Sequence, residues 1–149
     1  MLSILNARQV RGILANLKER FGFEGKLEYV FLLSDKERIY IVNPEIARLP
    51  LDKLRVNTFG MYFGEWKRGE ARLSIEGSQL IGPRCSKNVL ELDEERMKLW
   101  LRGYDVPLSY LDRGFVILRH ETDFLGCARA LEGKLQNFVP KNRRVKANA

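Results

Sequence analysis

The sequence predicts an α+β fold made of two small lobes. Three observations carry this prediction: a long helical pattern near the N-terminus, short apolar segments after it, and a second series of a strand, a helix and three strands that begins near Pro83. With 149 residues, 45% of them hydrophobic, the chain is long enough to bury a proper core. We assign residues 1–76 to an N-terminal lobe and residues 77–146 to a C-terminal lobe.

The first expected element is a helix over residues 6–21. Its apolar side chains recur three and four positions apart and form one stripe: Val10, Ile13, Leu14, Leu17 and Phe21. Asn6 is a suitable N-cap, Gln9 follows it by three residues, and Gly22 stands where a helix ends. We therefore expect an amphipathic helix with one buried face.

Strands and short helices follow in the rest of the N-terminal lobe. Residues 27–33 and 38–42 are apolar runs separated by four polar residues, which predicts a hairpin. An Asn-Pro pair then predicts a short helix over residues 44–49, stopped by Pro50.

Four further segments complete this half of the chain. Residues 51–54 predict one helical turn, and residues 56–66 predict a strand that two glycines bend. Residues 72–75 read as a half-buried strand with Ser74 on its polar face. Residues 77–83 are expected to be a turn or a short helical connection.

The C-terminal lobe is expected to hold a strand over residues 89–92 and a helix over residues 94–102. Asp93 caps this helix and Gly103 ends it. Three strands joined by hairpin-length turns follow, over residues 115–119, 124–131 and 135–139.

The charge of the chain is unevenly distributed. The net charge is +7 and the pI is about 9.6, which favours nucleic-acid contact but also fits a protein with other acidic partners. Between residues 134 and 149 there are five Lys or Arg residues and no Asp or Glu. A polyanion is the natural partner of this segment.

The remaining composition argues for an intracellular, reducing setting. Cys85 and Cys127 belong to no CxxC pair, so we read both as small buried hydrophobic residues. The first residues lack the apolar run of a signal peptide, and no transmembrane stretch occurs. We expect a cytoplasmic protein that does not bind a membrane.

Catalysis and cofactor binding have little support in the sequence. The one histidine, His120, has no Ser or Cys partner in a recognisable arrangement, and we read it as a hairpin-end residue. Neither a dinucleotide-binding glycine motif nor a phosphate-binding P-loop is present. We expect no enzyme activity, no cofactor and no metal.

Two glycine positions allow two interpretations each. Arg102 and Gly103 end the second helix, either as an ordinary C-cap or as a place where another backbone comes close. Gly126 lies inside a predicted strand, where it either forms a bulge or leaves room for a close approach.

The basic cluster near the C-terminus is either a solubilising tail or a presented binding surface. Lys141, Arg143 and Arg144 follow a strand and a proline, and Arg129 and Lys134 lie nearby in the sequence. Because such a cluster can neutralise several phosphates, about four contacts with single-stranded RNA would make log affinity fall with log salt at a slope of roughly −3.

Two segments of the C-terminal half, RGFVIL and FLGCAR, form a glycine-led strand followed by an apolar-Gly-x-Ala strand. In this order they resemble the last part of a PUA domain. The helix end WLRGYDV, the segment GKLQNFVPK and the Arg143-Arg144 pair are similar to the PUA-like domain of RNA cytosine-C5 methyltransferases. In the N-terminal half, the stretch from Glu37 to Gly77 resembles the pre-PUA lobe of Nip7-type ribosome-biogenesis proteins, which suggests an archaeal-type protein.

This resemblance implies an α/β pre-PUA lobe packed on a PUA-like mixed β-barrel that binds structured RNA, either rRNA or tRNA, without a cofactor. The matching RNA-binding positions are Arg102, Gly103, Gly126, Arg129, Lys134, Lys141, Arg143 and Arg144. The methyltransferase domain is absent from this chain and neither cysteine follows a proline, so catalysis would come from a partner.

Two other functions stay open. The chain is expected to act in rRNA or tRNA maturation. It also fits an adaptor that docks an RNA-modifying enzyme or assembly factor through an exposed aromatic surface. The residues of that surface would be Phe59, Tyr62, Phe63 and Trp66. A small enzyme acting on nucleotides or modified bases would need convergent polar groups around a cavity.

Overall fold

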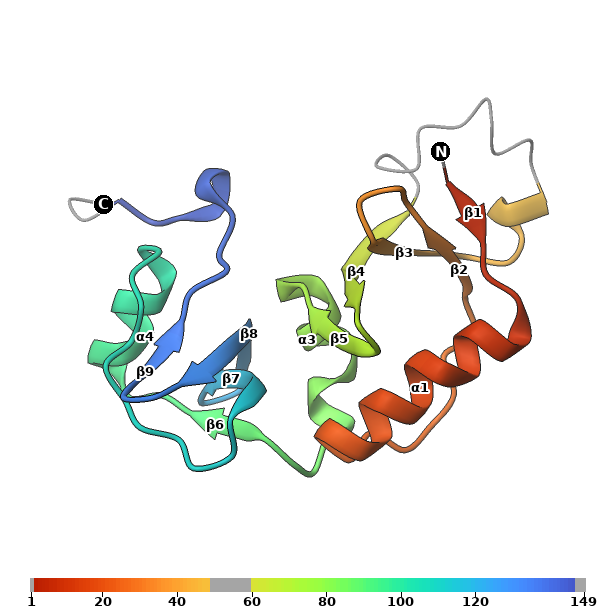
Figure 1. Ribbon diagram of the computed structural model, residues 1–149. Coiled ribbons are helices and arrows are strands. Elements are labelled where there is room, and N and C mark those ends of the chain that lie inside the picture. The colour runs from red at the N-terminus through yellow and green to blue at the C-terminus, as the bar shows by residue number, and fades with distance from the viewer. Residues whose placement is uncertain (1, 49–59, 147–149) are drawn as a thin grey trace.

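The computed structural model describes residues 2–48 and 60–146. Within them the protein contains helices and two separate sheets, which confirms the predicted α+β class (Figure 1). The N-terminal sheet has the order β1-β2-β3-β4-β5, with all neighbours antiparallel. Its strands are β1 Ser3–Ile4, β2 Val30–Leu33, β3 Arg38–Val42, β4 Met61–Lys67 and β5 Glu70–Leu73.

The C-terminal sheet has the order β6-β7-β8-β9. Its strands are β6 Val89–Glu91, β7 Gly114–His120, β8 Asp123–Leu131 and β9 Lys134–Gln136. The sheet is mixed, because β6 runs parallel to β7 while the other pairs are antiparallel. An antiparallel bridge between Val106 and Leu135 continues the pairing beyond β9.

The helices lie beside and between the sheets (Figure 1). Helix α1, Ala7–Phe21, covers the N-terminal sheet, and α4, Glu94–Leu101, belongs to the C-terminal lobe. Helix α3, Ile75–Ile81, stands between the sheets and contacts both β4 and β8. Three short 3₁₀ turns complete the described structure: η1 Ile46–Arg48, η3 Gly82–Arg84 and η4 Lys141–Arg143.

Helix α1 forms as its sequence predicts. The Asn6 side chain accepts a hydrogen bond from the Gln9 backbone, and the Gln9 side chain accepts one from the Asn6 backbone, which satisfies two backbone donors at the helix start. Gly22 ends the helix in the left-handed conformation, at φ 64°. The predicted apolar stripe is buried at Ile13, Leu17 and Phe21.

Three strand boundaries differ clearly from prediction. Strand β2, predicted to begin at residue 27, begins at Val30. At the other two, polar side chains take over the backbone bonding. Ser74, predicted inside a strand, caps α3 and accepts a hydrogen bond from the Gly77 backbone at 2.9 Å. Strand β9, predicted to reach Val139, ends at Gln136. There the Asn137 side chain accepts a bond from the Val139 backbone and donates to the carbonyl oxygens of Trp100 and Tyr104.

Several predictions fall outside the described residues. They are the helical turn over residues 51–54, the first part of the strand over residues 56–66, the end of the helix over residues 44–49, and the aromatic position Phe59.

One apolar core extends through both lobes. It joins Phe21 of α1, Phe63 of β4, Ile81 of α3 and Ile117 of β7, together with Cys127 of β8. A second core lies within the C-terminal lobe, around the fully buried Trp100. Because the first core is shared, the two sheets are held at a fixed separation.

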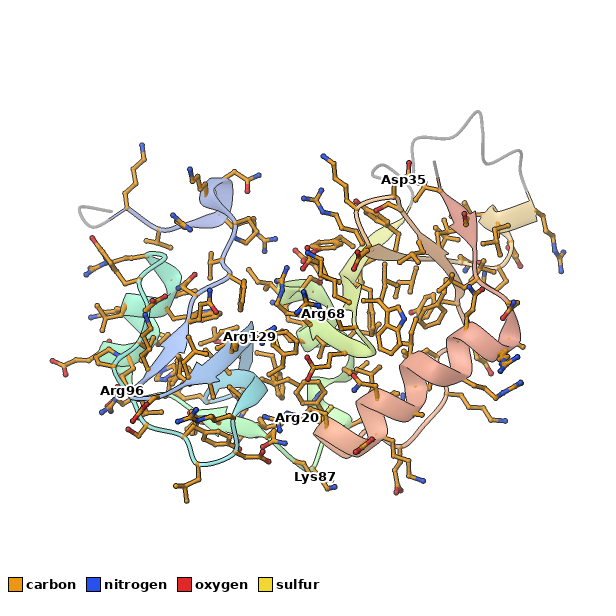
Figure 2. All side chains as sticks on the ribbon, viewed as in Figure 1. Arg20, Asp35, Arg68, Lys87, Arg96 and Arg129 are labelled. Carbon is orange, nitrogen blue, oxygen red and sulfur yellow. The ribbon has the colours of Figure 1, made fainter. Side chains whose placement is uncertain are left out.

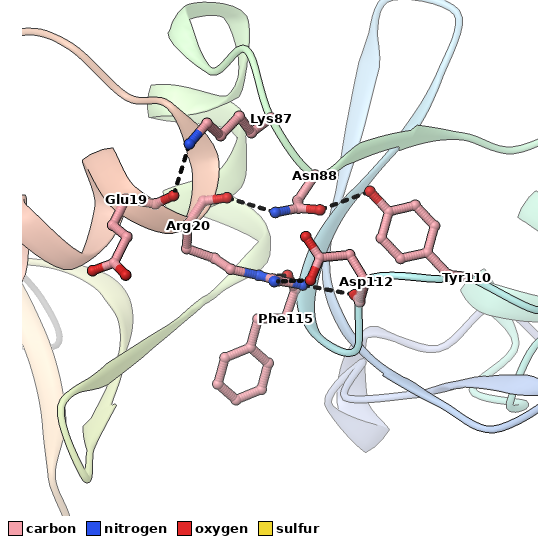
Figure 3. A network of polar contacts seen from close by, with 7 residues as sticks. All are labelled: Glu19, Arg20, Lys87, Asn88, Tyr110, Asp112 and Phe115. Carbon is pink, nitrogen blue, oxygen red and sulfur yellow. Dashed lines mark hydrogen bonds and ion pairs between the residues drawn. The ribbon is translucent and has the colours of Figure 1, made fainter.

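A polar network also joins the lobes (Figure 3). From α1, Arg20 donates to the Phe115 carbonyl oxygen at 2.7 Å and to the Asp112 carboxylate at 2.9 Å. Asn88 donates to the Arg20 carbonyl oxygen and accepts a bond from the Tyr110 hydroxyl, both at 2.7 Å. The helix end is thereby bonded to the loop before β7.

Across residues 2–48 and 60–146, none of the helices combines the length and the apolar character needed to cross a membrane.

Replacing Arg20 with Met should weaken the attachment between the lobes. The variant leaves the half-buried Phe115 carbonyl oxygen without its charged donor, so we expect the free energy of unfolding to fall by about 1.5–3 kcal/mol. Urea unfolding followed by circular dichroism measures the change. Arg11→Met, at an exposed position of the same helix, is the control and should change stability by less than about 0.5 kcal/mol. Equal losses in the two variants would contradict this role of Arg20.

His120 should make stability depend on pH. Its Nδ1 donates to the Leu92 carbonyl oxygen at 2.8 Å, and this bond, helped by nearby glutamates, raises the pKa of His120 above its ordinary value. The native state then holds the proton more tightly than the unfolded state. The resulting stabilisation is complete below about pH 6.5 and is lost as pH rises through the native-state pKa.

Urea unfolding of the wild type and of His120→Gln between pH 5.5 and 8.5 tests this expectation. The wild type should lose stability with rising pH more steeply than the variant across that window. Parallel curves, or a native His120 pKa at or below about 6.5 by NMR titration, would contradict it.

Candidate nucleic-acid interface

The basic segment that follows Pro140 is anchored to the fold. Lys141 and Arg143 lie in η4, and Arg144 follows it. The Arg144 Nε donates to the Val139 carbonyl oxygen at 3.1 Å, and the Val145 backbone donates to the Leu101 carbonyl oxygen at 2.9 Å. The segment through Val145 is therefore held against α4 while its side chains stay exposed.

Arg102 and Gly103 meet this segment at the end of α4. Arg102 is the C-cap residue, and Gly103 follows with φ +89°, so the C-cap interpretation holds. The close-approach interpretation expected another backbone at this glycine, whereas the atoms nearest to Gly103 belong to the Arg144 side chain of the same chain. A Cβ at position 103 would lie 2.4 Å from the Arg144 Cδ atom. Arg144 and the C-cap residue Arg102 therefore lie at the same helix end, and Lys141 and Arg143 belong to the short segment that leads to it.

Four of the predicted cations, Arg102, Lys134, Lys141 and Arg143, differ in how much their charge is offset. Lys134 forms an ion pair with Asp105 at 3.3 Å and helps lower the pKa of that carboxyl, after the larger effect of the Asn137 backbone bond. Arg143 forms an ion pair with Glu76 of α3. Among the described residues, Lys141 and Arg102 have no ion-pair partner.

Gly126 lies buried in β8 at φ +115°, next to a register shift in the β7–β8 pairing. Leu118 pairs with Gly126 and Arg119 with Phe124, so Leu125 is the extra residue of a bulge, as one of the two interpretations predicted. A Cβ on Gly126 would lie 3.3 Å from the Ile75 side chain. The close neighbour is therefore α3 of the same chain, and a role of Gly126 in RNA binding stays a prediction.

Arg129 does not join the basic segment but faces the N-terminal lobe. It is half-buried in β8, and its guanidinium carbon lies 4.5 Å from the centre of the Phe115 ring. Figure 2 shows Arg129 across from Arg68 of the β4–β5 turn, on facing sides of the space between the sheets. Both residues line a cavity of about 660 Å³.

A second cavity of about 580 Å³ adjoins this one, and the two share Glu65, Arg72 and Phe138 as lining residues. We call the pair of cavities the inter-lobe cleft. The second cavity is lined by residues of β4, β5 and α3 on one side and by Phe138, Asn142 and Arg143 on the other. The cleft therefore reaches the basic segment at η4.

Arg72 is the central residue of the inter-lobe cleft. Its Nη2 lies 2.8 Å from the Glu65 carboxylate, and its guanidinium stacks on the Phe138 ring at 4.4 Å. The side chain is only 16% exposed. Tyr62 lies beside it, and burial raises the pKa of the Tyr62 hydroxyl. A planar cation, a carboxylate and aromatic rings thus share one wall.

Sequence reasoning missed Arg72 and Phe138 as site residues, and it named Tyr62 only as part of an exposed docking surface. Strand alternation did put Arg72 and the apolar Leu73 on opposite faces, but a polar face of one strand is usually a solvated face. Only the position of the second sheet turns that face into the wall of a cleft.

The predicted exposed aromatic surface is wrong at Phe63, and Trp66, whose exposure would distinguish the interpretations, is not exposed. Phe63 is fully buried in the shared core, and Trp66 is half-buried against that core. Tyr62 lines the inter-lobe cleft and contacts Tyr40, with ring centres 5.6 Å apart. These aromatics therefore pack inward or line the cleft.

The thiols are ill suited to chemistry at neutral pH. Burial raises the pKa of Cys127 to about 12 and that of Cys85 to about 11, so both stay protonated. Cys127 is buried and Cys85 is half-buried, close to the prediction for both. In the part of the chain that the structure describes, no group of three His, Cys, Asp or Glu residues is placed to hold a metal ion.

Comparison with known proteins shows which family model and which relatives this chain resembles. Residues 87–145 match the family described as the methyltransferase RsmF PUA domain. A ribosomal RNA small subunit methyltransferase F from Shewanella sp. (strain MR-4) is 25% identical over 145 residues, covering 92% of this chain and 30% of the relative. Its counterpart from Aeromonas salmonicida is 24% identical over 140 residues, covering 93% of this chain and 29% of the relative.

The relative from Vibrio cholerae serotype O1 (strain M66-2) carries the same name and is 24% identical over 99 residues, with 66% of this chain and 21% of the relative covered. The chain thus spans about 30% of the length of the first relatives, and the alignments include much of the N-terminal lobe. The Nip7-type resemblance and the archaeal type stay predictions. The C-terminal part of this chain is a PUA-like domain related to that of RNA cytosine-C5 methyltransferases.

Proposed function

We propose that this chain binds structured RNA in rRNA maturation, without catalysing a reaction itself. The observation that supports this most is the match of residues 87–145 to the RsmF PUA domain, together with relatives named as ribosomal RNA methyltransferases. The presence of basic side chains on the matched part supports it further, because most protein contacts to nucleic acid are made to phosphates. The alternative RNA ligand is tRNA. We propose that the protein acts in the cytoplasm.

The proposed phosphate-binding surface is the basic segment at the end of α4. Lys141, Arg143 and Arg144 are exposed there, and Arg102 is half-buried beside them. Because the segment is anchored through Val139 and Leu101, its cations are held close together before RNA arrives. Such preorganisation lowers the entropy lost on binding.

The adaptor function is the weaker alternative. It relied on an exposed aromatic surface, and Phe63 of that surface is buried in the core. An RNA-modifying enzyme or a ribosome-assembly protein remains a proposed partner of the RNA-bound chain.

The salt dependence of RNA binding tests the proposal. With about four phosphate contacts, log affinity should fall with log salt at a slope of roughly −3 for an rRNA fragment. The double variant Lys141→Gln/Arg102→Gln should lower the affinity and reduce the slope to about −1.5, since each lost contact removes about 0.7. Fluorescence anisotropy at three salt concentrations gives both quantities.

The matched control is Lys98→Gln, which removes an exposed lysine on α4 that is paired with Glu94. It should leave the slope unchanged. The proposal fails if the wild type binds rRNA no better than a random polyanion, or if the control changes the slope as much as the double variant.

A further inference from the structure

We infer that the inter-lobe cleft receives one unpaired nucleotide of the bound RNA, with the base against its aromatic wall and the phosphate near η4. This inference rests on the proposed RNA-binding function and assigns a second, base-binding site to it. Its chemical target is a purine or pyrimidine ring attached to a phosphate.

The cleft has the size and wall chemistry for a nucleobase. Its η4-side cavity, about 580 Å³, lies within the usual range of small-molecule sites, roughly 300–1,000 Å³. Tyr62, Met61 and Phe138 line it and are half-buried, so each offers part of its apolar surface to the cavity. Unpaired RNA bases typically stack on aromatic rings and on arginine guanidinium planes.

The charges of the cleft fit a nucleotide rather than an apolar ligand. The cations that line the two cavities outnumber the acids: Arg38, Lys67, Arg68, Arg72, Arg129 and Arg143 against Glu37, Glu65, Glu70 and Glu76. The excess favours a phosphate. The carboxylates matter as well, because a carboxylate such as that of Glu65 accepts hydrogen bonds from base amino groups.

The Arg72 guanidinium is held in place by two neighbours. Glu65 on one side and the Phe138 ring on another hold its guanidinium plane, and the side chain is largely buried. A plane held in place before binding loses little entropy when a base stacks on it. Arg129 on Phe115 is a second plane of the same kind in the neighbouring cavity.

The position of the cleft indicates an unpaired nucleotide of a longer RNA. Pro140, Asn142 and Arg143 line the cleft and belong to the same short segment as Lys141, the proposed phosphate contact. An RNA backbone lying on the basic segment is therefore adjacent to the cleft opening. A base within a duplex is stacked and paired, so only a bulged or single-stranded nucleotide presents its faces.

The test compares three ligands with the full 149-residue chain: an RNA hairpin with one bulged 2-aminopurine, the same hairpin fully paired, and the free nucleoside monophosphates. Anisotropy gives the affinities, and 2-aminopurine fluorescence reports stacking of the bulged base. The wild type should bind the bulged hairpin at least about 5-fold more tightly than the paired one, with a change in fluorescence.

Arg72→Lys keeps the charge but removes the planar stacking group, and it should abolish the preference for the bulged hairpin. Arg119→Lys is the matched control, because Arg119 also pairs with a glutamate, Glu91, and lies 6.0 Å from a ring centre, that of Phe124, outside the cleft. Phe138→Leu is a second cleft variant, in case Arg72→Lys unfolds in urea at a much lower concentration than the wild type.

Loss of the preference in the cleft variants but not in Arg119→Lys supports the inference. Equal wild-type affinity for bulged and paired hairpins overturns it and leaves the proposed function standing. Failure to bind either hairpin overturns both. Free nucleotides that bind as tightly as the bulged hairpin also overturn it, because the cleft would then be a site for a free nucleotide.

Discussion

The structure depends on an apolar core that the two lobes share. Phe21 at the end of α1 and Ile81 at the end of α3 lie in the same buried cluster as residues of both sheets. Neither sheet could be moved away from the other without exposing this cluster to water, which makes the relative position of the lobes a consequence of hydrophobic burial. The hydrogen bonds of Arg20 also fix the relative orientation of the two lobes, because their distances and angles are satisfied in only one orientation.

The fixed separation of the sheets explains why a cleft with buried charges is possible. Arg72 of β5 contacts Phe138 of the segment after β9, so this contact spans the two lobes. Burying an arginine is costly unless it is paired and hydrogen-bonded, and Glu65 provides that partner from the neighbouring strand. A cation that is costly to bury, yet is held between a carboxylate and an aromatic ring, is more informative about function than an exposed cation.

The basic segment and the cleft divide the proposed recognition of RNA into two physical parts. Exposed cations around the end of α4 act on the phosphate backbone, which gives affinity without reading sequence. A cleft with ring faces and a fixed guanidinium plane acts on a base. The match to the RsmF PUA domain spans residues 87–145, so it includes the basic segment through Val145.

The sequence by itself determined the local elements: the caps at Asn6 and Asp93, the glycine that ends α1, and the apolar stripe of that helix are short-range properties. The sequence also located the basic segment, because a cluster of Lys and Arg residues can be read directly from their order along the chain. Three facts depended on the tertiary structure alone. Arg129 lines the inter-lobe cleft and does not lie beside the basic segment, Phe63 is buried, and Arg72 faces the C-terminal lobe. Strand alternation tells which residues share a face, but what covers that face depends on contacts between residues far apart in the chain.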